Sequence, residues 1–128
     1  MKILIIVGAR PQFIKMAVIH RAIQKYKQEK HSHLIQEILI HTGQHYDYGM
    51  NQVFFEEMGL PDPDVNLNIH SKLQGEMIGA MITSLEKELL LKKPDCVLVF
   101  GDTNSTLAGA LAASKLHIPI AHIESGLR

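Results

Sequence analysis

The chain has 128 residues, of which 46% are hydrophobic and 20% are charged, a composition typical of a globular domain with its own core. Thirteen basic residues balance thirteen acidic ones, so no overall field favours nucleic acid or an anionic membrane as a partner. The single cysteine excludes disulfides within the chain and cysteine-rich metal sites, and we expect a reducing, cytoplasmic location.

The first strand and helix are predicted from the N-terminal segment. Lys2–Val7 is a continuously apolar, β-branched run, which predicts a strand covered on both faces and is too short for a signal peptide or membrane helix. After a turn at residues 8–10, Pro11 suits the first position of a helix that extends to about Glu29. Five residues are expected along one apolar side of this helix: Ile14, Ala17, Val18, Ala22 and Tyr26.

Two further strands and a helix are expected before residue 70. Leu34–His41 reads as the second strand and leads into a loop at residues 42–45. A helix over Tyr48–Met58 ends at Gly59, a residue type suited to the left-handed position after a helix. Val65–Ile69 is expected to be a short strand.

The next helix has the clearest pattern. Met77, Met81, Leu85 and Leu89 recur every fourth residue, and Pro94 ends the helix. This stripe indicates core or interface. Because the apolar side is broad enough to contact a partner subunit, we expect a homodimer.

The C-terminal segment predicts a strand–helix–strand unit with an acid after each strand. An apolar run over Cys96–Phe100 precedes Asp102, a helix is expected over residues 103–117, and a second run over residues 118–123 precedes Glu124. The strands of such a unit run parallel, so both acids emerge at the carboxyl edge, where open α/β sheets bind ligands. Neighbouring strands lie about 4.8 Å apart, which lets both carboxylates reach one substrate. The alternation predicts a doubly wound, Rossmann-like parallel sheet with helices on both faces.

The two acids have different alternative explanations. Asp102 stands where a residue could cap the following helix. Glu124 precedes no clear long helix, and a carboxylate at the mouth of a buried strand needs a partner or a function. As a pair they are an acid–base candidate, because neighbouring carboxylates push their pKa values apart.

The turn after the first strand favours phosphate over a dinucleotide cofactor. Residues 8–12 contain one glycine instead of the three of the dinucleotide fingerprint, so no cofactor is expected. Arg10 and Lys15, together with the helix dipole, are candidates to clamp a diphosphate; the alternative is a pair of solvated cations. Gln44 and His45 line either a polar pocket or a surface loop. The histidines lack metal-ligand spacing, so no metal site is expected.

Four segments together carry a resemblance to a known family. They are GARP at residues 8–11 with Lys15, TGQH at 42–45, KPD to GDT at 93–103, and HIESGLR at 122–128. The chain resembles the N-terminal domain of the non-hydrolysing UDP-N-acetylglucosamine 2-epimerases. The resemblance implies a glycosyltransferase-B-type fold, of which residues 1–128 are the incomplete N-terminal half, a single Rossmann-like domain. The UDP-binding domain is then expected past Arg128, and the 128 residues alone are expected to be inactive.

The resemblance also implies a reaction and site residues. Such epimerases invert C2 of the sugar by eliminating UDP, forming a 2-acetamidoglucal, and adding UDP back after reprotonation from the other face. Asp102 and Glu124 match the acid–base positions of the family. Arg10 and Lys15 match its substrate-binding basic positions, and Gln44 and His45 fall where many bacterial members bind a second UDP-N-acetylglucosamine as activator. The implied partner is a UDP-sugar, without nucleic acid or membrane.

Three features leave alternatives open. Asp47 replaces a glutamine of many activator sites, which puts allosteric activation in doubt. Residues 104–109 also resemble relatives that epimerise UDP-2,3-diacetamido sugar uronates. A non-catalytic remnant that binds a nucleotide sugar or a partner protein is the third possibility.

Overall fold

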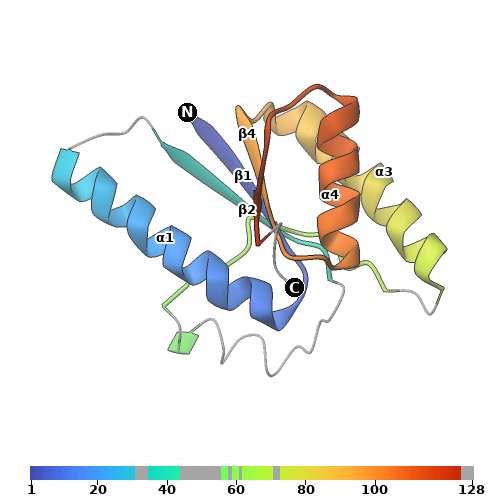
Figure 1. Cartoon of the computed structure of the whole chain (residues 1–128), viewed down its shortest axis with the longest axis horizontal. Coiled ribbons are helices and arrows are strands. Elements are labelled where there is room, and N and C mark those ends of the chain that lie inside the picture. The colour runs from blue at the N-terminus through green and yellow to red at the C-terminus, as the bar shows by residue number, and fades with distance from the viewer. Residues whose placement is uncertain (31–34, 44–55, 58, 61, 71–72, 125–128) are drawn as a thin grey trace.

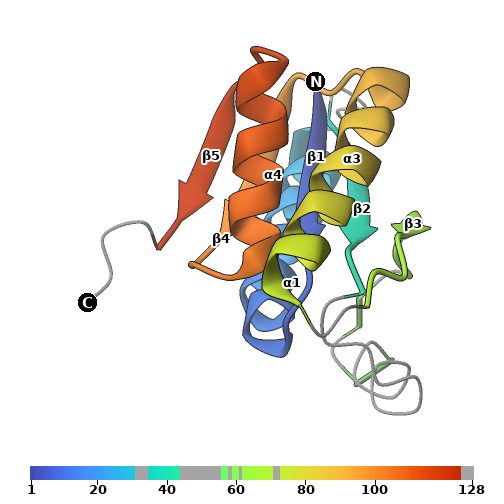
Figure 2. The same ribbon diagram turned by 90° about the vertical axis from the view of Figure 1, so that its right-hand side faces the viewer.

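The computed structural model describes residues 1–30, 35–43, 56–57, 59–60, 62–70 and 73–124. Five parallel strands form one sheet in the order β3-β2-β1-β4-β5, seen from β5 to β3 in Figure 2. In chain order the elements are β1 (Lys2–Val7), α1 (Arg10–Lys30), β2 (Gln36–His41), β3 (Val65–Asn66), α3 (Gln74–Lys92), β4 (Cys96–Phe100), α4 (Asn104–Lys115) and β5 (Ile120–Ile123). This order confirms the doubly wound, Rossmann-like sheet. Successive strands are added on one side of β1 as far as β3 and then on its other side from β4 onward, so the topological switch point lies between β1 and β4.

Helices cover both faces of the sheet, as expected. Figure 1 shows α1 on one side and α3 with α4 on the other. Alternate residues of β1 supply the two cores: Leu4 and Ile6 pack with the α3 and α4 residues, whereas Ile5 and Val7 pack with those of α1. Because both sides of the strand are buried, its sequence is continuously apolar.

The larger core lies beneath α3 and α4. Its α3 contribution is the predicted stripe, which is buried throughout: Met77, Met81, Leu85 and Leu89. Small residues let α4 approach the sheet, and a Cβ on Gly109 would lie 2.7 Å from Cδ1 of Ile6. The stripe is therefore core. The expected homodimer stays a prediction, and its contact surface has to come from other residues.

The prediction of which side of α1 faces the core is wrong. Ile14, Val18 and Tyr26 are 47%, 61% and 44% exposed, and Ala22 is exposed as well. Of the expected residues only Ala17 is buried, and it lies beside Phe13 and Met16 in the core. Both stripes fit a helical period, so the sequence pattern did not distinguish them. Contacts made by the first turn of α1, described below, set its rotation.

Several boundaries differ from expectation. β2 begins at Gln36, and β3 is only two residues long because the chain turns at Asn68, whose φ is 53°. The helix expected over Tyr48–Met58 falls almost wholly outside the described residues. α3 ends through Lys93 in the left-handed conformation, directly before the proline. Within the described segments, no helix has the length and apolarity needed to cross a bilayer.

Candidate functional site

The two strand ends that carry the acids are neighbours in the sheet. β4 and β5 pair in parallel up to Phe100 opposite Ile123, and the Gly101 N–H donates to the Ile123 carbonyl at 2.9 Å. Asp102 lies two residues beyond the end of β4, and Glu124 lies one residue beyond the end of β5. The structure therefore brings both acids to the carboxyl edge of adjacent strands.

Asp102 is exposed and does not cap the following helix. The residue that caps α4 is Thr103, whose Oγ1 accepts from the Thr106 N–H. In return, the Thr103 N–H donates to Oγ1 of Thr106 at 3.2 Å, which completes a capping box. The capping alternative for Asp102 is therefore wrong. Among the described residues, none forms a hydrogen bond or ion pair with the Asp102 carboxylate.

Glu124 is held by a lysine from the opposite end of the chain. Its Oε1 forms an ion pair with Nζ of Lys15 on α1, and the Glu124 side chain is 22% exposed. The backbone of Glu124 has a φ of 71°, in the left-handed region that residues with a Cβ rarely adopt. A nearby ammonium favours the ionised carboxylate. Lys15 thus contacts an acid of the candidate site.

The turn after β1 differs from the phosphate-binding turn of dinucleotide folds. There the backbone N–H groups hold the pyrophosphate, but here those of Gly8 and Ala9 donate to Oε1 of Gln12 at 2.7 Å and 3.1 Å. Arg10 is exposed at the start of α1. The remaining predicted residues, Gln44 and His45, lie outside the described residues.

Tight packing beneath this turn explains Gly8. Oγ1 of Thr42, just after β2, and Oγ of Ser105, in the first turn of α4, form a buried hydrogen bond of 2.8 Å. A Cβ on Gly8 would lie 2.1 Å from the Ser105 oxygen and 2.5 Å from the Thr42 oxygen. The ends of β1 and β2 and the start of α4 therefore meet across a position that admits only glycine.

His41 at the end of β2 is buried and structural. Its Nδ1 accepts from the Gly43 N–H at 2.8 Å, and its ring lies 4.9 Å from that of Phe13. Burial, reinforced by the charge of nearby His70, lowers the pKa of His41 to about 4. His41 is therefore neutral near pH 7.

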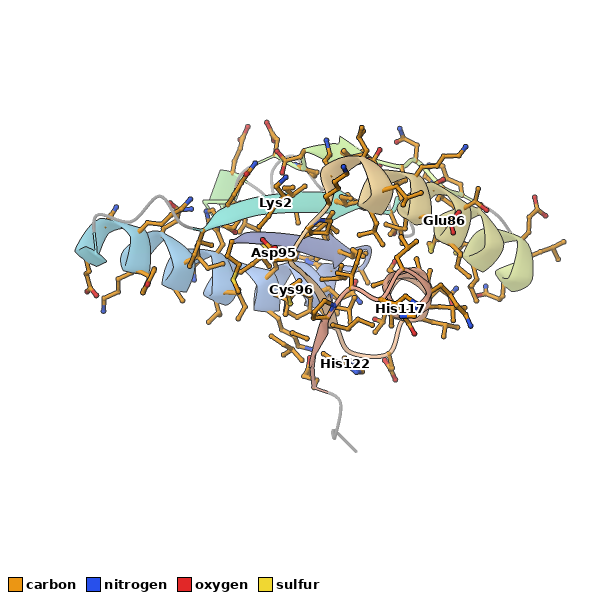
Figure 3. The ribbon with its side chains drawn as sticks, turned by 90° about the horizontal axis from the view of Figure 1, so that it is seen from above. Lys2, Glu86, Asp95, Cys96, His117 and His122 are labelled. Carbon is orange, nitrogen blue, oxygen red and sulfur yellow. The ribbon has the colours of Figure 1, made fainter. Side chains whose placement is uncertain are left out.

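His122 links the two acid-bearing strand ends. It lies on β5, the edge strand beside β4 (Figure 3), and its Nε2 is 2.6 Å from the Gly101 carbonyl, to which it donates. No local sequence pattern predicted a role for His122 or for Gln12. For Gln12 the available signal was its position next to Phe13, since both residues lie on the side of α1 that is buried.

A pocket of about 460 Å³ lies away from these groups, beside α1 and β2. Its lining includes His20, whose Nδ1 lies 2.9 Å from Oε2 of Glu37, and Gln24, which donates a hydrogen bond to the same glutamate. None of the candidate residues lines it. The two acids instead lie at the carboxyl edge of the sheet, beyond the ends of β4 and β5.

Comparison with known proteins decides the family. Residues 26–128, more than half of the chain, match the sequence model described as UDP-N-acetylglucosamine 2-epimerase. The chain belongs to this epimerase family. Its sheet matches the Rossmann-like part of the glycosyltransferase-B-type epimerase structures, which confirms the expected fold.

Individual relatives cover the entire chain. A Pseudomonas aeruginosa protein named UDP-2,3-diacetamido-2,3-dideoxy-D-glucuronate 2-epimerase is 56% identical over 128 residues, which are 34% of its length. The crystal structure of the Methanocaldococcus jannaschii UDP-GlcNAc 2-epimerase with UDP-GlcNAc and UDP is 52% identical, with a TM-score of 0.89 over 33% of its chain. The Neisseria meningitidis enzyme bound to UDP-GlcNAc is 38% identical, with a TM-score of 0.86 over 33% of its chain. The chain thus spans about a third of the length of these relatives.

Proposed function

We propose that a protein of the relatives' full length containing this chain interconverts UDP-N-acetylglucosamine and UDP-N-acetylmannosamine. The observation that carries the proposal is the register of β4 and β5, since it brings Asp102 and Glu124 to adjacent strand ends at the edge where such sheets bind ligands. The family membership and the UDP-GlcNAc bound in two similar structures, those from Methanocaldococcus jannaschii and Neisseria meningitidis, support this substrate.

The chemistry requires two groups that exchange protons at C2. No carbonyl acidifies this C–H bond, so the proposed route couples its loss to departure of UDP. A carboxylate takes the C2 proton, the C1–O bond to UDP breaks, and a C1=C2 double bond forms. A carboxylic acid on the other face then returns a proton to C2 while a UDP oxygen adds back to C1.

We assign the proton transfers to Asp102 and Glu124 and the charge stabilisation to Arg10 and Lys15. The ion pair with Lys15 suits Glu124 to act as the carboxylate that accepts the proton. Asp102, exposed and without a described partner, then acts as the second group. Arg10 at the start of α1 stabilises the departing diphosphate.

Location and assembly complete the proposal. We place the reaction in the cytoplasm, because one half-buried cysteine suits a reducing compartment. We also propose a homodimer, which sedimentation of the full-length protein at several concentrations tests. A constant monomer mass would contradict it.

The experiment follows the anomeric NMR signals of UDP-N-acetylglucosamine with the full-length protein. Asp102→Asn and Glu124→Gln should each lower kcat by about a thousandfold, the scale of general acid–base catalysis. The matched control is Asp95→Asn, at the opposite edge of the sheet, where Oδ2 of Asp95 accepts from the Lys2 N–H at 2.7 Å (Figure 3). Near-normal rates in both site variants would remove these acids from the mechanism.

A second candidate substrate is a UDP-2,3-diacetamido sugar uronate. The specific observation is the 56% identity to the Pseudomonas aeruginosa protein of that name. Assaying both nucleotide sugars with one preparation decides between them. The ratio of the two kcat/KM values assigns the substrate.

A further inference from the structure

The strands at the centre of the sheet separate toward the candidate site. The hydrogen-bonded register of β1 and β4 runs only from Ile3 opposite Cys96 to Ile5 opposite Leu98, although the strands continue to Val7 and Phe100. By contrast, β4 and β5 remain paired to the end. Backbone pairing therefore does not hold the turn after β1 against the turn after β4.

One buried side chain spans this gap. Gln12 is 3% exposed, and its Oε1 accepts from both N–H groups of the turn after β1, as described above. Its Nε2 donates to the Phe100 carbonyl at 2.9 Å and to Oγ1 of Thr103 at 2.7 Å. Oγ1 of Thr106 lies 3.2 Å from the same nitrogen. The amide thus joins the end of β1 to the turn that carries Asp102.

We propose that Gln12 is a positioning residue for epimerisation, a role that rests on the proposed function. It holds the Asp102 turn at a set distance from the first turns of α1, which carry Arg10 and Lys15. The amide suits this place because one end only accepts and the other only donates. The proton-transfer group after β4 is thereby fixed relative to the cations that meet the diphosphate.

The test uses two substitutions at Gln12 in the full-length protein. Gln12→Met has similar length but makes none of the hydrogen bonds, so the Asp102 turn should shift and kcat should fall by about a hundredfold, the typical cost of a 1 Å misplacement. KM should change by less than about threefold, because the binding groups remain. Gln12→Glu still accepts from the two N–H groups, but it sets an acceptor oxygen against the Phe100 carbonyl, to which the amide nitrogen donates in the wild type. It should therefore lose kcat about as far as Gln12→Met, which would show that the bridge needs the donor end of the amide.

A matched control separates positioning from stability. Leu85→Ala removes a fully buried side chain on the opposite face of the sheet. It should destabilise the fold yet leave kcat within about threefold of the wild type below its unfolding temperature. The positioning role is overturned if Gln12→Met retains kcat within that range, or if Gln12→Met and Leu85→Ala lose kcat in parallel with stability.

Hydrogen exchange tests the bridge without any turnover. In Gln12→Met, exchange of the amides of Gly8, Ala9 and Thr103 should accelerate at least about tenfold relative to those of β2. Gln12→Glu should retain the protection of Gly8 and Ala9 but lose that of Thr103, because only the acceptor end of the bridge remains. Unchanged exchange in Gln12→Met would overturn the bridging role. If the wild type epimerises no UDP-sugar, the proposed function fails, while the exchange result still decides whether Gln12 holds the turn.

Discussion

The two acid-bearing strand ends are adjacent, yet they are supported in opposite ways. The turn with Asp102 is braced from the core, where the Phe100 carbonyl accepts from both Gln12 and the Thr106 hydroxyl. Glu124 depends on an ion pair with Lys15, which is itself 36% exposed, and on a left-handed backbone. Adjacent register therefore does not make two acids equivalent. One is preset by buried hydrogen bonds, and the other is adjustable by solvent, salt and ligand.

The largest effect is expected from a substitution in the buried packing beneath the turn after β1. Gly8→Ala forces a methyl group against the Thr42–Ser105 hydrogen bond and should lower the free energy of unfolding by about 3 kcal/mol, through overpacking and the loss of that bond. Urea denaturation measures the change. Gly79→Ala is the control, because its Cβ meets nothing within 4 Å on α3 and should stabilise the helix by about 0.5 to 1 kcal/mol. Equal effects of the two variants would contradict the packing argument.

The second prediction concerns the pH dependence of stability that the buried side chain of His41 causes. His41 has a pKa lowered to about 4, against 6.5 for the ordinary side chain, so the unfolded state binds a proton more readily than the folded state. The contribution of neutral His41 to the free energy of unfolding is present above pH 6.5 and is lost as the pH falls toward 4. By pH 5 the loss amounts to about 2 kcal/mol.

Denaturation curves at about pH 7.5 and pH 5 measure this slope. His41→Asn is the matched variant, since its amide oxygen still accepts from the Gly43 N–H but does not titrate. The slope should be smaller in the variant by the contribution of His41. An unchanged slope would place the acid sensitivity elsewhere.

The smallest effect is expected from removing the lysine that pairs with Glu124. In the full-length protein, Lys15→Met should lower kcat by about tenfold, a modest loss because both members of the pair are partly exposed. In a Glu124→Gln background the further loss should be smaller than tenfold, because only the contribution of Lys15 to the diphosphate remains, whereas in a Gln12→Met background the two losses should multiply. Steady-state kinetics of the double variants measure the coupling. Full multiplication in both backgrounds would show that Lys15 contributes through the diphosphate alone and not through Glu124.

Local patterns gave much of the architecture. The apolar runs predicted β1 and β4 with the bounds that the structure has, and the four-residue spacing predicted the buried stripe of α3. The strand–helix–strand order also placed Asp102 and Glu124 at one edge. These succeeded because they depend on short-range periodicity and on the geometry of parallel strands.

Predictions that required a choice between similar local options failed. On α1 two apolar stripes competed, and the one containing Ile14 and Val18 proved exposed. At α4 the sequence suggested Asp102 as a possible cap, but the next residue, Thr103, caps the helix. The partner of Lys15 lies more than a hundred residues away in sequence, so no local pattern predicts it.

By itself the sequence determined the class of fold, the order of strands and helices, and the family whose motifs the chain carries. Tertiary structure alone decided which side of α1 is buried, which groups the Gln12 amide joins, and which acid the lysine contacts. The physical reason is that the spacing of apolar residues reflects the regular geometry of a helix or strand packed on a core. Hydrogen bonds and ion pairs between distant segments depend instead on atomic distances that only the packed sheet and helices establish.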